Sequence, residues 1–100
     1  MIRHIVMFKL VEFADSVEKQ AKMQEIKTRL EALKDKIELL HKIEVDFNVN
    51  PAEAWDLVLT AEVQSLKDLS DYANHPDHID VTKNVIAPAK ADRACIDYEF

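Results

Sequence analysis

Hydrophobic positions along the chain follow two different periods, which divide the chain into strands and helices. Residues 2–11 are apolar at both odd and even positions, and residues 55–63 are apolar on one parity with the uncharged Val58 and Thr60 on the other. Residues 39–47 alternate apolar and polar, and residues 93–100 carry apolar side chains on one parity. A period of two is that of a β-strand, and a strand that is apolar on both faces is buried on both. These patterns predict four strands, with the charged side of the segment at 39–47 indicating a place near a sheet edge.

Between these strands the apolar period changes to that of a helix. In residues 16–37, apolar side chains recur at steps of three and four, and Asp15 or Ser16 can cap the start. The sequence from Ser65 to Asp68 resembles a capping box. It opens a helix whose predicted inward residues are Leu66, Leu69, Tyr72 and Ala73. Pro76 breaks this helix, because the residue before a proline is pushed out of helical geometry, and a second helical segment runs on until Pro88.

The order βαββαβ predicts an α+β fold, namely a ferredoxin-like single domain over residues 1–100 with an antiparallel sheet. That fold has helices on one face of its sheet only. The first and third strands, which are central in this topology, are nevertheless apolar on both faces. A second copy of the chain is the most economical cover for the bare face, so we expect a homodimer in which two sheets form an α/β barrel.

Composition narrows the class of protein further. The formal net charge of −6 argues against nucleic acid and against anionic membrane surfaces as partners. No apolar run approaches the roughly 20 residues of a membrane span. Cys95 is the single cysteine, which excludes an internal disulfide and favours a cytoplasmic location. The chain has no glycine, so glycine-rich phosphate loops and dinucleotide-binding turns are excluded.

Candidate chemistry is concentrated in the segment Tyr72-Ala73-Asn74-His75-Pro76-Asp77-His78 and at His4 in the first strand. Histidine titrates near neutral pH, and a tyrosine hydroxyl can donate a hydrogen bond to a developing oxyanion. Structural interpretations remain open for each of them: His78 can hold the helix junction through a backbone hydrogen bond, and Tyr72 can pack its ring inward. His4 can be a core histidine paired with a neighbour. Pro76 disrupts the helical register that would bring the rings of His75 and His78 together around a metal ion, so we expect no metal site. Cys95 is expected to be a small core residue.

Three stretches resemble the stress-responsive dimeric α/β-barrel family, called Dabb. They are His4-Ile5-Val6-Met7-Phe8-Lys9, the segment from Tyr72 to His78, and the run from Val81 through Ile86, Pro88 and Arg93 to Asp97-Tyr98. The resemblance covers essentially the whole chain and implies a homodimeric barrel of ferredoxin-like subunits. Most members of the family have no assigned reaction, and some plant members are linked to stress responses.

The resemblance leaves two functions open. The first is a stress-associated or small-ligand-binding dimer without an assigned activity, whose ligand is hydrophobic or contains a carbonyl group. The alternative is a cofactor-free lyase or polyketide cyclase, in which residues matching Tyr72 and His78 form an acid–base pair; a monooxygenase is a more distant interpretation. No cofactor is expected in either case. The residues expected to contact a ligand are His4, Val6, Phe8, Leu59, Leu69 and His75.

Overall fold

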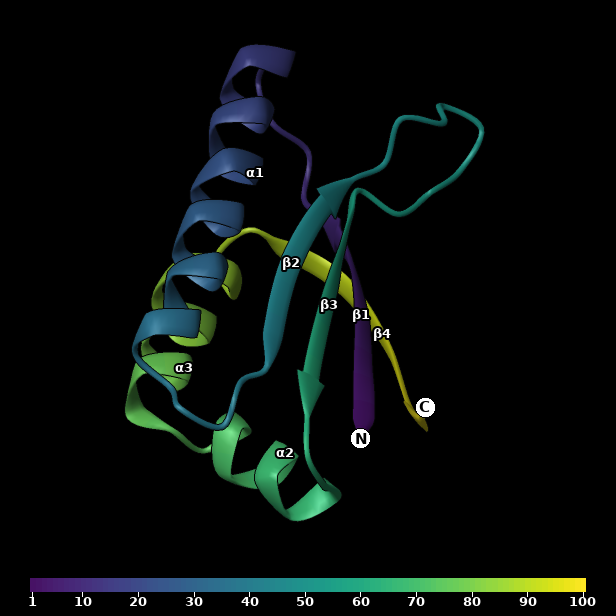
Figure 1. Cartoon of the computed structure of the whole chain (residues 1–100). Coiled ribbons are helices and arrows are strands. Elements are labelled where there is room, and N and C mark those ends of the chain that lie inside the picture. The colour runs from purple at the N-terminus through teal and green to yellow at the C-terminus, as the bar shows by residue number, and fades with distance from the viewer.

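The computed structural model describes all 100 residues and contains one antiparallel sheet with its helices on one side (Figure 1). Its strands are β1 (Ile2–Leu10), β2 (Lys42–Phe47), β3 (Leu57–Val63) and β4 (Lys90–Glu99). The helices are α1 (Ser16–Glu31), α2 (Leu66–Ala73) and α3 (Pro76–Val81), with a 3₁₀ turn η1 (Ala32–Asp35) and a π-helical turn η2 (Thr82–Ile86). The predicted ferredoxin-like α+β fold is therefore confirmed.

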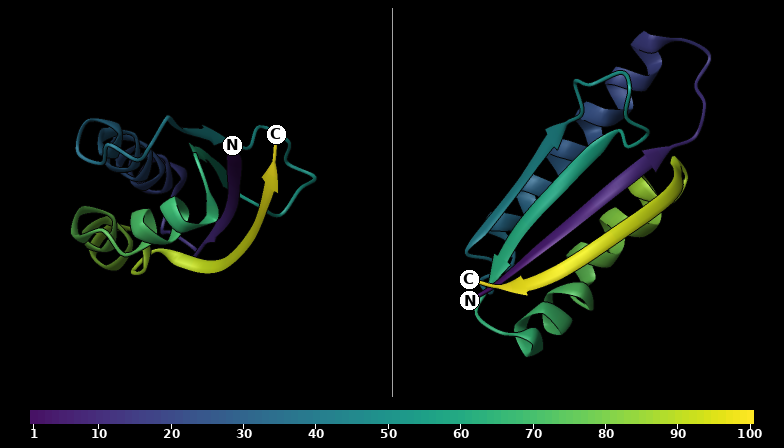
Figure 2. Two further views of the ribbon diagram at one scale, coloured as in Figure 1. Left: turned by 60° about the horizontal axis from the view of Figure 1, so that its bottom comes forward. Right: turned by 90° about the vertical axis from the view of Figure 1, so that its right-hand side faces the viewer.

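The strand order in the sheet is β2-β3-β1-β4, so the two strands that are apolar on both faces are the central ones. In Figure 2 the sheet twists and β4 curves away from the plane of its neighbours, while the helices stay on one side. The side chains of β1 alternate between the two faces: His4 and Val6 face the helices, and Ile5 and Met7 face away. We call the side without helices the open face. The predicted edge position of β2 is also confirmed.

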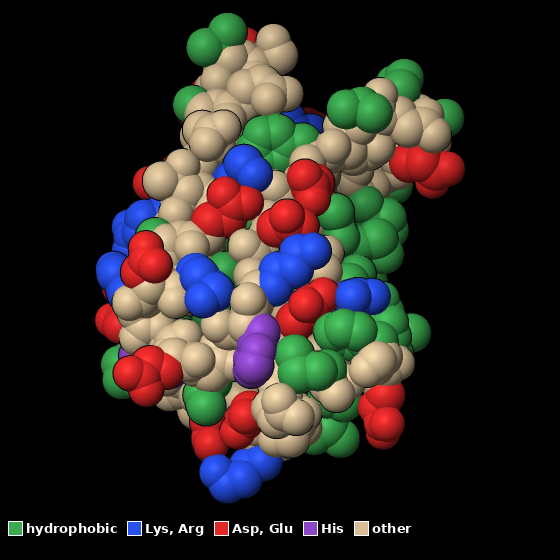
Figure 3. All heavy atoms as spheres, in the orientation of Figure 1, with side chains coloured by type: hydrophobic (Ala, Val, Ile, Leu, Met, Phe, Trp, Pro, Cys, Tyr) green, Lys and Arg blue, Asp and Glu red, His purple; other side chains and the backbone are tan.

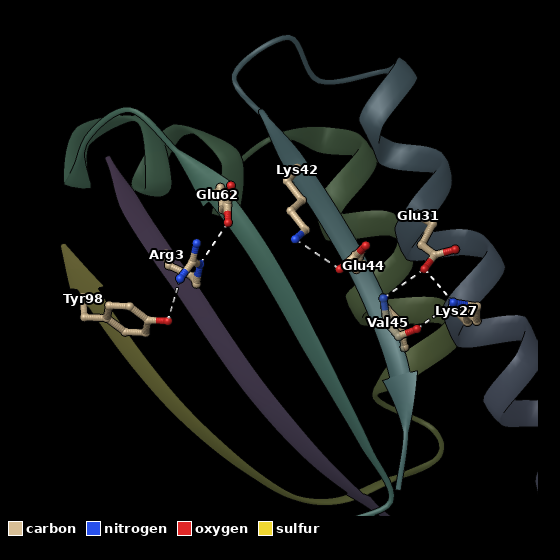
Figure 4. A network of polar contacts seen from close by, with 8 residues as sticks. All are labelled: Arg3, Lys27, Glu31, Lys42, Glu44, Val45, Glu62 and Tyr98. Atoms are coloured by element: carbon tan, nitrogen blue, oxygen red, sulfur yellow. Dashed lines mark hydrogen bonds and ion pairs between the residues drawn. The ribbon is translucent and has the colours of Figure 1, made fainter. Parts of the chain in front are cut away.

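A hydrophobic core of 21 buried residues fills the space between the sheet and the helices. The apolar stripe predicted for α1 contributes Met23, Ile26 and Leu30, all buried. On the free edge of β2, Lys27 and Glu31 of α1 reach the backbone of Val45 (Figure 4). The Lys27 ammonium donates to the Val45 carbonyl at 2.6 Å, and the Val45 amide donates to the Glu31 carboxylate at 2.9 Å. These contacts occupy backbone groups that would otherwise be free to pair with another strand.

Several boundaries of helices and strands differ from those expected from the sequence. The helix expected over 16–37 ends as an α-helix at Glu31 and continues as the 3₁₀ turn η1, while the apolar side chains of Leu33 and Ile37 beyond it are still buried. The strand expected over 39–47 begins at Lys42, and the last strand begins at Lys90 rather than at 93. Leu66 and Ala73, the first and last residues of α2, were both expected to face inward and are both exposed, Leu66 to 63%, although both border the cavity beside α2.

The turns form without glycine, and no residue in the chain has a positive φ. Between β2 and β3, asparagine side chains hold the connection. The Asn48 side chain accepts from the Asn50 amide at 2.8 Å and donates to the Trp55 carbonyl at 2.8 Å, while the Asn50 side chain accepts from the Ala52 amide at 3.0 Å. Short polar side chains thus replace the backbone freedom that glycine usually supplies. None of the helices has both the length and the apolar character needed to cross a membrane.

Candidate ligand site

A cavity of about 560 Å³ lies between the sheet and the helix pair α2–α3, within the range of small-molecule sites. Ten of the seventeen residues that line it are hydrophobic. Its wall is formed by residues of the three strands β1, β3 and β4, of the C-terminal part of α1, and of the segment from α2 to η2. The cavity lies where the β1 side chains that face the helices meet the two short helices α2 and α3 that follow β3.

Most of the residues expected to contact a ligand do line this cavity. They are His4, Val6, Phe8, Leu59, Leu69, Tyr72 and His78. The structure does not bring His75 to the wall. That side chain caps the start of α3 instead, where its Nδ1 accepts a hydrogen bond from the Asp77 amide at 3.1 Å. The reason is the pre-proline geometry of His75, which turns its ring back onto the first turn of α3.

Tyr72 is the largest fully buried side chain and stands at the centre of the polar part of the wall. It comes from the last turn of α2, whose start is capped by the Ser65 hydroxyl. Its ring lies 4.4 Å from that of His78 and 6.4 Å from that of His4, measured between centroids, so the predicted convergence of the three rings is present. Burial raises the pKa of the Tyr72 phenol above its ordinary value. The hydroxyl keeps its proton, yet no protein group lies within hydrogen-bonding distance of it.

His78 lies on α3 beside Tyr72, and its protonation is set by its surroundings. Its Nδ1 is 2.9 Å from the Ala73 carbonyl oxygen. Because a carbonyl only accepts, Nδ1 carries the hydrogen, and the lone pair of the neutral ring is on Nε2. Burial lowers the pKa of His78, whereas the bond to Ala73 acts in the opposite direction, and nearby positive charge, that of Arg93 included, lowers the pKa further. The ring is therefore neutral at physiological pH, and Nε2 is available as an acceptor or a base.

His4 is held by a residue that the sequence did not single out for its chemistry. In the antiparallel pairing of β1 with β4, His4 lies opposite Asp97, and its Nδ1 donates to the Asp97 carboxylate at 2.5 Å. The Cys95 sulfur lies 3.5 Å from the same nitrogen. Two ligand atoms of one tetrahedral zinc ion would stand about 3.3 Å apart, farther than His4 Nδ1 is from the Asp97 carboxylate oxygen. The contact between His4 and Asp97 therefore has the length of a hydrogen bond. The three side chains form a hydrogen-bonded cluster on the cavity wall.

The expectation for Cys95 is wrong, because Cys95 is exposed and lines the cavity instead of packing in the core. The desolvation of its sulfur raises the thiol pKa, and the charge of Asp97 raises it further, so the group is not an activated nucleophile. Sequence reasoning also missed Arg93, Lys90 and Asp97 as parts of the wall. The signal that could have found Arg93, Cys95 and Asp97 is the polar parity of the last strand, opposite the apolar parity of Ala94, Ile96 and Tyr98.

The antiparallel sheet and its one-sided helices define a ferredoxin-like α+β protein with a small-molecule-sized cavity. The chain belongs to the Dabb family, the Stress responsive A/B Barrel Domain, whose model matches residues 2–100. The family resemblance seen in the motifs is thereby confirmed.

Three relatives illustrate what the chain is similar to. A stress-response A/B barrel domain-containing protein of Arabidopsis thaliana is 33% identical over 99 residues, which is 98% of this chain but only 36% of that protein. The chain thus spans about a third of the length of this curated relative. A crystal structure from Bacteroides fragilis, described as a dimeric protein of unknown function and ferredoxin-like fold, shares 43% identity and a TM-score of 0.91, with 99% of this chain and 95% of that one covered. The hydroxynitrile lyase of Passiflora edulis shares the fold, with a TM-score of 0.80 and 16% identity over 97% of this chain and 90% of that one.

Proposed function

We propose that this chain forms a homodimer in which each subunit binds a small organic molecule with an acceptor oxygen next to Tyr72. The observation that carries the proposal is the buried Tyr72 hydroxyl without a partner in the protein. Leaving a buried donor unpaired costs roughly 1–3 kcal/mol, and buried polar groups in proteins nearly always have a partner. A ligand carbonyl or hydroxyl oxygen in the cavity would accept this hydrogen bond and recover that free energy.

The surroundings of Tyr72 favour binding of a molecule that is apolar over most of its surface. Val6, Phe8, Leu59 and Ile86 supply hydrophobic wall. The rings of His4 and His78 lie beside Tyr72 and form a polar part of the wall. A mostly apolar cavity with a few convergent polar groups is the usual form of a small-molecule site.

The dimer is supported by the open face of the sheet. Ile5, Met7 and Val58 lie there without cover from any helix, and Ile96 is 62% exposed. Figure 3 shows hydrophobic side chains gathered on the right-hand side of the view, where this face lies. The similar protein from Bacteroides fragilis is described as dimeric. The Dabb family and the Arabidopsis relative are named for stress response, and we extend that association to this chain.

Catalysis by an acid–base pair of Tyr72 and His78 is less well supported than binding. The neutral His78 ring beside the phenol is compatible with a base. An acid, however, must release its proton during the reaction, and burial raises the pKa of Tyr72 so that the phenol retains it. This favours Tyr72 as a hydrogen-bond donor to a bound oxygen over Tyr72 as a proton donor.

Calorimetric titration with nonan-2-one, a neutral ketone with an apolar chain, tests the proposal. We expect saturable binding, one molecule per subunit, and an affinity about three- to tenfold weaker for Tyr72→Phe, because one hydrogen bond is lost. Tyr98→Phe is the matched control: this tyrosine lies on the open face, and its variant should bind as the wild type does. Absence of binding to the wild type, or equal binding to Tyr72→Phe, would contradict the proposal.

A further inference from the structure

We propose that the ligand of this cavity is a carboxylic acid with an apolar body, whose carboxylate is bound by Arg93 and Lys90. This inference rests on the proposed function and names the class of molecule that the same cavity takes. The inference follows from two positive side chains on the cavity wall that form no ion pair with an acidic residue of the chain.

The charge of the cavity wall is opposite to that of the chain. The chain has a formal net charge of −6, with 19 acidic residues against 13 lysines and arginines. Arg93 and Lys90 both line the cavity, and no carboxylate lies within ion-pair distance of either cation. The only acidic residue on the wall is Asp97, which already accepts the hydrogen bond of His4. An anion entering the cavity therefore meets two unpaired cations and one carboxylate that is already engaged.

The pairing of β1 with β4 separates the cations from the phenol. Arg93 lies opposite Phe8 and Lys90 opposite Leu10, whereas Asp97 lies opposite His4, which approaches Tyr72. Four residues along a strand correspond to about 13 Å, so the cationic end and the Tyr72 end lie at different places along the cavity. Arg93 is exposed and lines the cavity together with His78 and Cys95.

A ligand that satisfies both ends carries a carboxylate at the cationic end and an acceptor oxygen next to Tyr72, joined by an apolar part. Its apolar part would pack on Val6, Phe8 and Ile86, which line the intervening wall. Its carboxylate would accept hydrogen bonds from the Arg93 guanidinium, the side chain best suited to hold a carboxylate in a bidentate pair, with the Lys90 ammonium as a second charge. A neutral molecule of the same shape would leave both cations without a partner, so charge is the property that this wall selects.

Paired probes of equal length separate charge from shape. Decanoate and decanamide differ in their polar head, and only decanoate is ionised at neutral pH. In calorimetric titrations of the wild-type protein we expect decanoate to bind at least about tenfold more tightly than decanamide, as hydrogen-bonded ion pairs exceed neutral hydrogen bonds. The double variant Arg93→Gln/Lys90→Gln should bind the two probes equally. Lys83→Gln is the matched control, since Lys83 is also exposed and unpaired but lies outside the cavity, and it should keep the wild-type preference.

Competition with nonan-2-one shows whether the acid occupies the same cavity, because the ketone should displace decanoate from a shared site. If decanamide binds as tightly as decanoate, or if the double variant keeps the preference for decanoate, the inference is wrong while the proposed function stands. If nonan-2-one fails to bind the wild type, the proposed function itself is wrong and the inference falls with it. Decanoate that binds without being displaced by the ketone would also overturn the inference.

Discussion

The two faces of the sheet differ in the kind of group that the subunit leaves unsatisfied. On the open face Arg3 has polar partners on both neighbouring strands: it donates to Glu62 at 2.9 Å and to the Tyr98 hydroxyl at 3.1 Å (Figure 4). Its guanidinium also lies 3.9 Å from the centre of the Phe100 ring. Apolar side chains such as Met7 and Ile96, in contrast, have no cover. On the helix-covered face the apolar side chains are packed, and it is the Tyr72 hydroxyl that lacks an acceptor.

This difference indicates what each face can bind. Uncovered apolar area suits another protein surface, because burying it removes hydrocarbon from water. An unsatisfied donor inside a packed apolar wall suits a small molecule with acceptor oxygens, because such a molecule supplies a few hydrogen bonds without displacing the core. One sheet can therefore serve as a dimerisation surface on one side and as the floor of a ligand site on the other.

The largest effect is expected from a charge on the open face. In Met7→Lys, an ammonium replaces a thioether in the middle of β1, and burying an unpaired charge in the dimer should weaken association by about 100-fold or more. Sedimentation equilibrium at micromolar concentration measures this. Lys83→Glu, an exposed change outside the open face, should remain dimeric. A Met7→Lys protein with the wild-type dissociation constant would show that this face is not the interface.

A smaller effect, this time a gain in folding stability, is expected from a substitution on the helix-covered face. Tyr72→Phe removes a buried hydroxyl that has no partner, so the free energy of unfolding of the ligand-free protein should rise by about 1 kcal/mol. Urea unfolding of the wild type and the variant measures the difference. Tyr98→Phe should instead leave stability unchanged or slightly reduced, since its hydroxyl accepts from Arg3. A Tyr72→Phe protein less stable than the wild type would mean that the hydroxyl is satisfied without ligand.

The smallest effect concerns pH. Because burial lowers the pKa of His78, the unfolded chain binds a proton at this residue more readily than the folded one. The contribution of His78 to stability is therefore complete above its ordinary pKa near 6.5 and decreases as the pH falls toward the lower folded value. The unfolding free energy of the wild type should fall more on acidification than that of His78→Asn. Titration of the His78 ring by NMR provides the direct measurement, and a value above the ordinary one would contradict the assignment.

Features that depend on local geometry were predicted well from the sequence. Strand parity places His4, Val6 and Phe8 on one face, and helical spacing brings Tyr72 to the inward side of α2. Both follow from periods within a single element, so no knowledge of the rest of the fold is required. The exceptions are Leu66 and Ala73, which have the expected period but stand at the two ends of the short helix α2 and are exposed.

Features that depend on pairing between distant segments were missed. The contact of His4 with Asp97 joins residues 93 positions apart, and it exists because β4 pairs with β1 in one particular register. Parity alone does not fix that register. His75 illustrates the opposite case, in which local chemistry was underestimated: an imidazole before Pro76 can cap the following helix, and that use withdraws it from the cavity.

The absence of glycine bears on the unfolded chain as well as on the folded one. Every residue carries a Cβ, so each backbone position samples a narrower range of conformations before folding and loses less entropy when it becomes ordered. No position in the fold has a positive φ, so no turn requires glycine for its backbone conformation. The connection between β2 and β3 depends instead on the hydrogen bonds that the Asn48 and Asn50 side chains accept. Substitutions at Asn48 and Asn50 are therefore limited to residues whose short side chain accepts a hydrogen bond. At the remaining loop positions, proline or alanine can be substituted at little conformational cost wherever the backbone amide forms no hydrogen bond.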